Sequence, residues 1–191
     1  MTDTTNLGPV IDVLADLRAK GIFSDFAIGG AVAGILHNEP FNTIDLDIFF
    51  FFTERQTCLI LSLEKIYDYV RGRGFSFDKD FINIHGWPVQ FVESSDNKLW
   101  TEAVETAPMK TIDYRQIKVI DPEHLAAMWI LAGRKKDFYK IDQFDEAGLM
   151  KPAKLRDILE RFDLLQKWRT KQADFSSNNR ICKNVFSNAF N

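Results

Sequence analysis

Apolar positions along the chain change repeatedly between helical and strand spacing. They recur at helical spacing between Pro9 and Gly21, which predicts a first helix. Similar spacing, or a short apolar run bounded by Pro or Gly, predicts helices at 31–38, 53–74, 97–107, 122–133 and 151–171, and 134–144 is charged and amphipathic. The chain is therefore expected to be rich in helices, above all after residue 121.

Strand spacing occupies the intervals between these helices. The run FSDFAI at 23–28 predicts a strand that leads into a glycine pair, and 42–52, β-branched and aromatic, is the clearest and most apolar strand. Two strands are predicted in 80–94, with a turn near Gly86, and a strand pair or bent strand in 110–121. The order predicts an α+β (mixed α/β) fold, in which a mixed sheet is flanked by helices and followed by a helical C-terminal portion.

Three regions follow from this order. We expect an α/β core at 1–121, a helical portion packed on it at 122–171, and a loosely ordered tail at 172–191, where Ser and Asn dominate. The chain has 191 residues, of which 46% are hydrophobic and 17 are Phe, enough for one large core.

Charge and cysteine content exclude some classes of protein. The net charge of −3 disfavours a broad electrostatic nucleic-acid binder, although a local basic patch remains possible. Cys58 and Cys182 fit no metal spacing, which favours a reducing compartment. No apolar run reaches the roughly 20 residues of a membrane span, and no basic start precedes a long apolar stretch. We expect a soluble cytoplasmic protein without a membrane partner.

Asp45 and Asp47 interrupt the most apolar strand. In a strand, residues two apart project from the same face, roughly 6.6 Å apart, with Ile44, Leu46 and Ile48 facing the core. Two adjacent carboxylates repel each other unless a cation lies between them, and Mg²⁺ prefers such oxygen ligands. The alternative is a solvated pair on an exposed strand face.

The glycine pair, Gly29 and Gly30, lies between a predicted strand and a predicted helix. Without side chains, glycines let a phosphate approach backbone N–H groups. Gly-Gly alone is more often a tight turn. Together with the nearby Asp-x-Asp strand, however, it supplies what phosphoryl or nucleotidyl transfer requires.

The run IGGAVAGILHNEPFNTIDLDIFF resembles the signature of the nucleotidyltransferase superfamily related to DNA polymerase β: Gly-Gly, a short helix, then Thr-x-Asp-x-Asp. Within that superfamily the sequence is most similar to small bacterial AbiEii-type and MNT-type nucleotidyltransferases, some of which are toxins of toxin–antitoxin pairs. The specific match spans 26–49, and a looser one reaches about residue 138.

The resemblance implies transfer of a nucleoside monophosphate from an NTP, dependent on Mg²⁺ or Mn²⁺. It assigns Gly29, Gly30 and Thr43 to nucleotide binding, and Asp45 and Asp47 to metal binding and catalysis. A tRNA or a protein side chain is the expected acceptor, and an antitoxin is a possible partner.

Two positions depart from the superfamily pattern. In PVQFVE, Gln90 takes the place of a third carboxylate; its amide oxygen binds Mg²⁺ weakly and accepts no proton near neutral pH. Glu93 lies three residues further on and should face the other side of the strand. Phe41 stands where many AbiEii-like relatives have arginine. Gln90 is kept as a catalytic candidate beside the aspartate pair.

The stretch GRKKDF is the nearest basic segment. Arg134 and Lys136 are predicted to bind the triphosphate, with Asp137 orienting one of the cations. The alternative is a solvated connection between helices.

Other polar residues carry weaker signals. The three histidines, His37, His85 and His124, form no metal or triad spacing, and Glu102 and Glu105 are expected on a solvated helix face.

Three functions remain open from the sequence. The leading one is a metal-dependent nucleotidyltransferase acting on a macromolecule. The alternative, motivated by Gln90 and Phe41, is a catalytically weak or inactive nucleotide-binding regulatory module. A third is an enzyme that modifies a small molecule such as an aminoglycoside. The sequence identifies neither the acceptor nor the preferred nucleotide.

Overall fold

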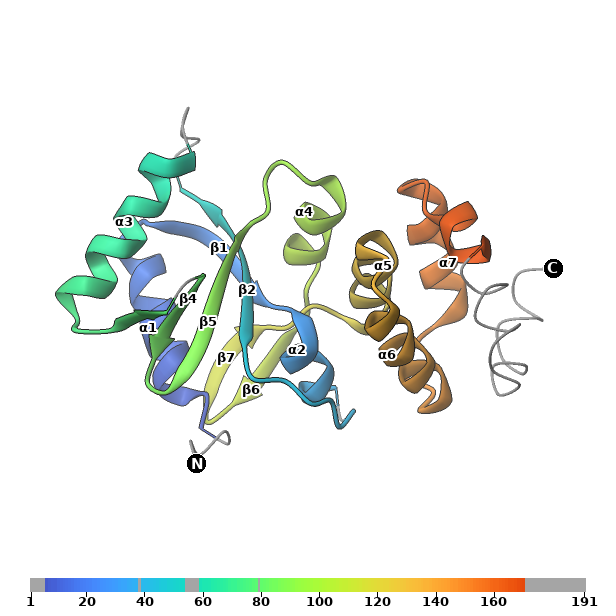
Figure 1. The fold of residues 1–191 in the computed structure, drawn as a ribbon, viewed down its shortest axis with the longest axis horizontal. Coiled ribbons are helices and arrows are strands. Elements are labelled where there is room, and N and C mark those ends of the chain that lie inside the picture. The colour runs from blue at the N-terminus through green and yellow to red at the C-terminus, as the bar shows by residue number, and fades with distance from the viewer. Residues whose placement is uncertain (1–5, 38, 54–58, 79, 171–191) are drawn as a thin grey trace.

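The fold is a mixed sheet with helices on both faces and further helices at one end (Figure 1). A computed structural model describes residues 6–37, 39–53, 59–78 and 80–170. The helices are α1 (Gly8–Ala19), α2 (Gly30–Leu36), α3 (Leu59–Gly72), α4 (Lys98–Glu105), α5 (Pro122–Ala132), α6 (Lys135–Glu146) and α7 (Pro152–Arg161). The strands are β1 (Phe23–Ile28), β2 (Leu46–Phe52), β3 (Ser76–Asp78), β4 (Phe81–Ile84), β5 (Trp87–Glu93), β6 (Met109–Ile112) and β7 (Arg115–Lys118).

The main sheet has five strands in the order β1-β2-β5-β4-β3. Only β2 and β5 run parallel; their register places Leu46 opposite Val89 and Asp47 opposite Gln90. The other neighbouring pairs are antiparallel. The separate hairpin β6-β7 joins the end of β1 through a bridge between Ile28 and Val119. The predicted mixed α/β fold is thus confirmed.

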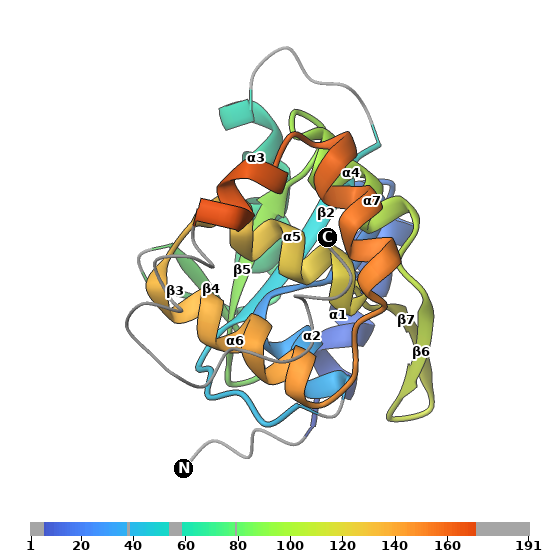
Figure 2. The ribbon, with the colours of Figure 1, turned by 90° about the vertical axis from the view of Figure 1, so that its right-hand side faces the viewer.

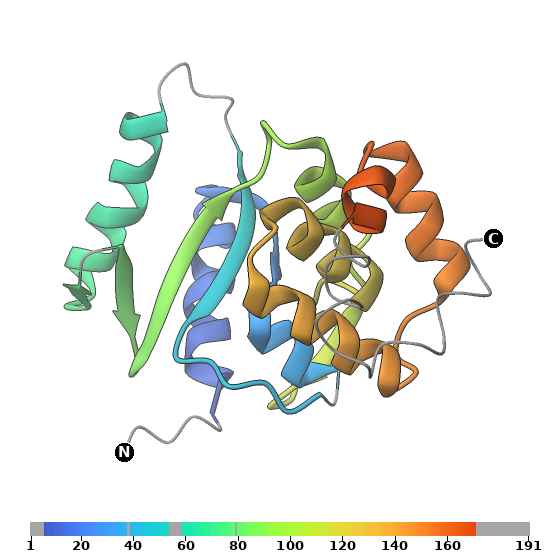
Figure 3. The same ribbon diagram turned by 45° about the vertical axis from the view of Figure 1, so that its right-hand side comes forward.

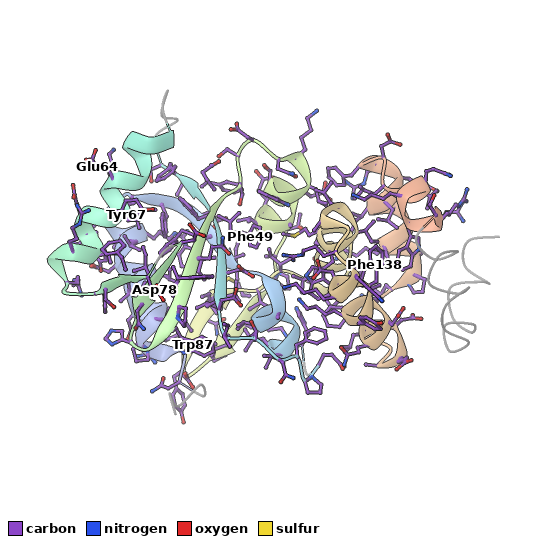
Figure 4. The ribbon with its side chains drawn as sticks, in the orientation of Figure 1. Phe49, Glu64, Tyr67, Asp78, Trp87 and Phe138 are labelled. Carbon is purple, nitrogen blue, oxygen red and sulfur yellow. The ribbon has the colours of Figure 1, made fainter. Side chains whose placement is uncertain are left out.

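The two faces of the sheet carry different helices. On one face, α1 and α3 lie together, and the Tyr69 hydroxyl of α3 donates a hydrogen bond to Asp16 of α1 (2.6 Å). On the other face, Phe49 of β2 packs edge-on against Trp100 of α4, and Figure 4 labels this phenylalanine beside β2. Beyond α2 and α4 lie α5, α6 and α7, which stand in front of the sheet in Figure 2.

The alternation of β2 explains its aromatic run. Phe50 is fully buried against Phe23 and also contacts Phe91, whereas its neighbour Phe49 points to the opposite face. Both faces of the strand are therefore covered, as its continuous apolar sequence indicates. Among the described helices, none is long and apolar enough to cross a membrane.

Several element boundaries differ from the prediction. The strand predicted from residue 42 begins only at Leu46, so Asp45 precedes it, and Ile44, expected in the core, is 83% exposed. The short strand β3 was not predicted. The final helix is interrupted at 162–164, where Asp163 has a φ of +55°, and helix resumes over 165–170.

Other predicted elements agree more closely or lie outside the description. The hairpin turn at His85–Gly86 and the strand pair β6-β7 are confirmed. The predicted start of the third helix at 54–58 and the tail at 172–191 fall outside the described residues.

Candidate functional site

Asp45 and Asp47 lie at the start of β2, although only Asp47 belongs to the strand. The Thr43 hydroxyl donates a hydrogen bond to the Asp45 carboxylate (2.7 Å) and also lies 3.2 Å from its carbonyl oxygen. Thr43 therefore orients Asp45 in the segment before the strand. Its predicted contact with a nucleotide stays a prediction.

The two aspartates are close enough to repel each other. The pKa of Asp47 is raised from 3.8 to about 6, first because the side chain is largely buried and second because of the negative charge of Asp45. Lys140, Arg134 and Lys136 act in the opposite direction without cancelling this rise. The pair carries excess negative charge on hard oxygen atoms, and this donor chemistry fits a divalent cation such as Mg²⁺.

The glycine pair lies directly against Asp47. The Gly29 N–H donates a hydrogen bond to the Asp47 carbonyl (2.9 Å). A Cβ at Gly30 would lie 1.9 Å from the Asp47 carboxylate, and Gly30 has a φ of +58°. A Cβ at Gly29 would lie 2.4 Å from the Phe49 ring. Both glycines are thus required for the close approach between β2 and the start of α2.

Gln90 joins this group from the neighbouring strand. It lies opposite Asp47 in the parallel β2-β5 pair, so the two side chains project from the same face. Glu93 lies opposite Phe50 and therefore faces the other side, as expected. Within the described ranges, no group of three or more His, Cys, Asp or Glu residues could hold a metal ion. An amide thus stands where a third carboxylate would complete such a group.

Phe41 is a core residue. Its ring lies 5.8 Å from that of Trp129 on α5 and 5.3 Å from that of Phe144 on α6, and only 8% of the residue is exposed. A Cβ at Gly34 would lie 2.1 Å from the Phe41 ring, so the ring also fills the space beside α2. In the place of the expected arginine, the chain has an apolar contact between the loop before β2 and the C-terminal helices.

The basic stretch surrounds a buried carboxylate. Asp137 is 0% exposed and accepts hydrogen bonds from Arg134 Nε (2.5 Å) and, more distantly, Lys140 Nζ (3.4 Å). The expected orienting role of Asp137 is therefore visible in its pairing with Arg134. Lys136 is exposed on the first turn of α6.

Lys140 was missed by the sequence analysis. Its ammonium group lies 5.1 Å from the centroid of the Trp129 ring, beside Asp137. The spacing of three residues between Asp137 and Lys140 on an amphipathic helix was the available signal, because such residues share one helix face.

A second polar group connects α4, α5 and α7, and the sequence analysis missed it too. His124 is buried, with Nδ1 2.8 Å from Asp121 and Nε2 3.1 Å from Glu102. Glu102 also accepts two hydrogen bonds from Arg161, at 2.5 and 2.8 Å, which lower its pKa, and its side chain is partly exposed rather than fully solvated. Lys154 lies 3.0 Å from Asp121. These residues come from distant segments, and no local pattern points to them.

Two solved structures are similar to this chain in fold. An antigenic nucleotidyltransferase-like protein from Paracoccidioides brasiliensis superposes with a TM-score of 0.56 at 15% identity, covering 93% of this chain and 90% of that one. The antibiotic-resistance factor ANT(2'')-Ia superposes with a TM-score of 0.50 at 15% identity, covering 92% and 97%. The chain has a nucleotidyltransferase-like fold. No family model and no curated protein sequence matches it.

The nucleotidyltransferase-like fold agrees with the superfamily resemblance of the Gly-Gly and Asp-x-Asp motifs. At 15% identity the likeness concerns the fold alone. The closer similarity to AbiEii-type and MNT-type proteins rests on the sequence motifs.

Proposed function

We propose that the protein is a nucleotidyltransferase that uses Mg²⁺ or Mn²⁺ to move a nucleoside monophosphate from an NTP to an acceptor. The observation that carries this proposal is the convergence of three segments: the glycine pair, the aspartate pair and Gln90. They are joined by the Gly29–Asp47 hydrogen bond and by the register of Asp47 with Gln90. The nucleotidyltransferase-like fold supports the same conclusion.

The metal would be held by Asp45 and Asp47, with the amide oxygen of Gln90 as a weaker neutral donor. Its chemistry would be to neutralise the carboxylates and to polarise a phosphoryl oxygen. Burial of Asp47, and then the negative charge of Asp45, raise the pKa of Asp47, and a bound cation would offset both effects. Asp45 is oriented for this role by the Thr43 hydroxyl.

The nucleotide would lie beside the glycine pair. Gly29 and Gly30 let the start of α2 pack directly against Asp47, and the phosphates would bind to the backbone N–H groups of this segment. Arg134 and Lys136, which both act electrostatically on Asp47, would balance the charge of the triphosphate. Thr43 completes the proposed nucleotide-binding set.

The proposed acceptor is a macromolecule, either a tRNA or a protein side chain. This choice follows from the AbiEii-type resemblance, as do the proposed antitoxin partner and a place in a toxin–antitoxin pair in the cytoplasm. ANT(2'')-Ia is an antibiotic-resistance factor, so small-molecule acceptors are tested beside macromolecular ones.

Transfer of label from α-³²P NTPs tests the proposal. The assay offers RNA, protein and small-molecule acceptors with Mg²⁺ or Mn²⁺. Wild-type protein should label one acceptor class, and Asp45→Asn and Asp47→Asn should each reduce the rate at least about 100-fold, since a metal ligand is lost in each. Asp78→Asn, at an exposed strand position, is the control and should keep the full rate. No incorporation into any acceptor would contradict the proposal.

Gln90 supports a second candidate, a nucleotide-binding module with little or no turnover. An amide opposite Asp47 can orient a ligand but cannot act as a general base. Calorimetry combined with the transfer assay distinguishes the two candidates. The module would bind NTP with Mg²⁺ without forming product, whereas the enzyme would bind NTP and form product.

A further inference from the structure

The buried carboxylate of Asp137 holds two cations. Arg134 approaches one oxygen at 2.5 Å and Lys140 the other at 3.4 Å, so the three side chains together carry one excess positive charge. Burial of Asp137 in the first turn of α6 requires such partners, because an unpaired buried carboxylate is strongly destabilising. Part of the positive charge is therefore available to another anion.

The side chain of Lys140 is more buried than that of Arg134, the residue that precedes α6. Its side chain is 18% exposed, whereas that of Arg134 is 57% exposed. The ammonium group also lies over the Trp129 ring, whose face attracts a cation. An ammonium with three N–H groups, of which Asp137 takes one, keeps further donors for a ligand.

This cluster lies beside the loop that leads to the aspartate pair. Trp129, whose ring lies against the Lys140 ammonium group, also contacts Phe41, in the loop that leads to Asp45. The same loop reaches α6 through Phe41 and Phe144, and α6 runs beside α2 (Figure 3). Lys140 is also among the cations whose charge acts on Asp47. Within the described part of the chain, no ion pair joins Lys140 to either aspartate.

We propose that Lys140 binds the triphosphate of the nucleotide, and that Asp137 is the residue that positions Lys140 for this contact. The inference rests on the proposed function and extends it, because it places the phosphates between β2 and the first two turns of α6. Arg134, on the other oxygen of Asp137, is the second cation of the same arrangement.

Equilibrium binding of tripolyphosphate and of ATP, each with Ca²⁺ in place of Mg²⁺ to prevent turnover, tests the inference. Lys140→Met keeps the aliphatic packing over Trp129 and removes the charge. It should weaken binding of both ligands at least about tenfold, the effect of one charge-assisted contact. Lys135→Met, an exposed position on the same turn as Lys136, is the matched control and should bind within twofold of wild type. Lys140→Gln repeats the test if the methionine variant misfolds.

The positioning role of Asp137 requires a double-mutant comparison. Asp137→Asn should weaken tripolyphosphate binding in the wild-type background, because Lys140 loses its charged partner. In the Lys140→Met background the same change should cost less than it does in the wild type, because only the contribution of Arg134 remains to be lost. An equal loss in both backgrounds would show that Asp137 acts only through the general packing of α6, and would overturn its positioning role.

The outcomes separate this inference from the proposed function. If wild-type protein binds ATP but Lys140→Met binds equally well, the role of Lys140 is overturned and the nucleotidyltransferase proposal stands. If wild-type protein binds no NTP under any condition, the proposed function fails and this inference fails with it. Loss of tripolyphosphate binding in Lys140→Met, with the control unchanged, supports both.

Discussion

At the scale of single residues, Asp47 combines burial with a repelling neighbour. Its pKa near 6 lies above the ordinary value of 3.8, so the folded state holds this proton more tightly than the unfolded state does. The resulting stabilisation is fully present below about pH 4 and is lost as the pH rises through 6. At neutral pH the metal-free protein therefore keeps a destabilising charge at the proposed site, a feature typical of functional positions.

Asp47→Asn should consequently stabilise the metal-free protein at neutral pH. The shift of about two pKa units corresponds to at most about 3 kcal/mol in the free energy of unfolding. Urea unfolding in EDTA between pH 4 and pH 8 measures this change: the variant should gain stability at pH 8 and little at pH 4. Mg²⁺ should then stabilise the wild type and leave the variant unchanged. Equal stability of both proteins across the whole pH range would contradict the assigned environment of Asp47.

Gly30 is the second residue on which the site depends. Gly30→Ala places a Cβ where the Asp47 carboxylate lies and imposes a side chain on a φ of +58°. We expect a loss of about 2 kcal/mol in the free energy of unfolding, together with weaker nucleotide binding. Gly72→Ala is the control, because a Cβ there meets no atom within 4 Å, and its stability should stay within about 0.5 kcal/mol. Unchanged nucleotide binding in Gly30→Ala would argue against phosphate approach at the glycine pair.

At the scale of elements, a charged group joins α5 to α4 and α7. Asp121 caps α5 by accepting a hydrogen bond from the His124 N–H (3.1 Å) and also contacts the His124 ring and Lys154. Burial alone would raise its pKa, but the hydrogen bonds from His124 hold the pKa well below 3.8. Because the pKa of Asp121 is lowered in the folded state, this carboxylate stabilises the fold at pH values above its ordinary pKa of 3.8. The stabilisation is lost as the pH falls below that value.

Asp121→Asn should therefore destabilise the protein at neutral pH. The amide can still cap α5 but loses the charged contacts, and we expect a loss of about 2 to 3 kcal/mol at pH 7. Because the unfolded wild type takes up a proton near the ordinary pKa of 3.8 and the folded state only at lower pH, the difference between the two proteins should shrink as the pH falls below 4. Asp157→Asn, in an exposed pair with Arg161, is the control and should change stability by less than about 1 kcal/mol. Thermal unfolding of both variants over pH 3 to 7 provides the comparison.

Most elements could be predicted because their signals are local. The strand at 23–28 and the helix starting at Pro122 follow from apolar spacing and helix-start residues, and the structure has both. The start of β2 could not be predicted in this way. Ile44 continues the apolar pattern, but pairing with β5 begins only where Leu46 meets Val89, and this long-range register is absent from the local sequence.

Some residues of the candidate site could likewise be predicted from local sequence, and others could not. The glycine pair and Asp45 and Asp47 lie within one short motif and were found from the sequence. The contribution of Lys140 depends on how α6 packs against Trp129, and that of Glu102 depends on how α7 returns to α4. Contacts of this kind join segments that are far apart along the chain, so local residue spacing does not predict them.

At the scale of the whole molecule, aromatic packing connects the sheet to the C-terminal helices. Phe41 contacts Trp129 on α5 and Phe144 on α6, and these two rings also lie 5.3 Å apart. Because the loop before β2 contributes to this cluster, the core predicted at 1–121 and the helices predicted at 122–171 share buried surface. The two regions should therefore unfold together rather than as separate units.

Phe41→Arg tests this connection against the superfamily pattern. If position 41 served phosphate binding, arginine would restore a missing cation and tighten NTP binding. The structure instead predicts a buried charge without a partner beside two aromatic rings, and a loss of more than about 3 kcal/mol in the free energy of unfolding. Phe41→Leu keeps the site apolar and should lose only about 1 to 2 kcal/mol. Urea unfolding followed by both far-UV circular dichroism and tryptophan fluorescence measures the change and its cooperativity. A stable Phe41→Arg protein with tighter NTP binding would show that residue 41 belongs to the nucleotide site rather than to the contact between the sheet and the helices.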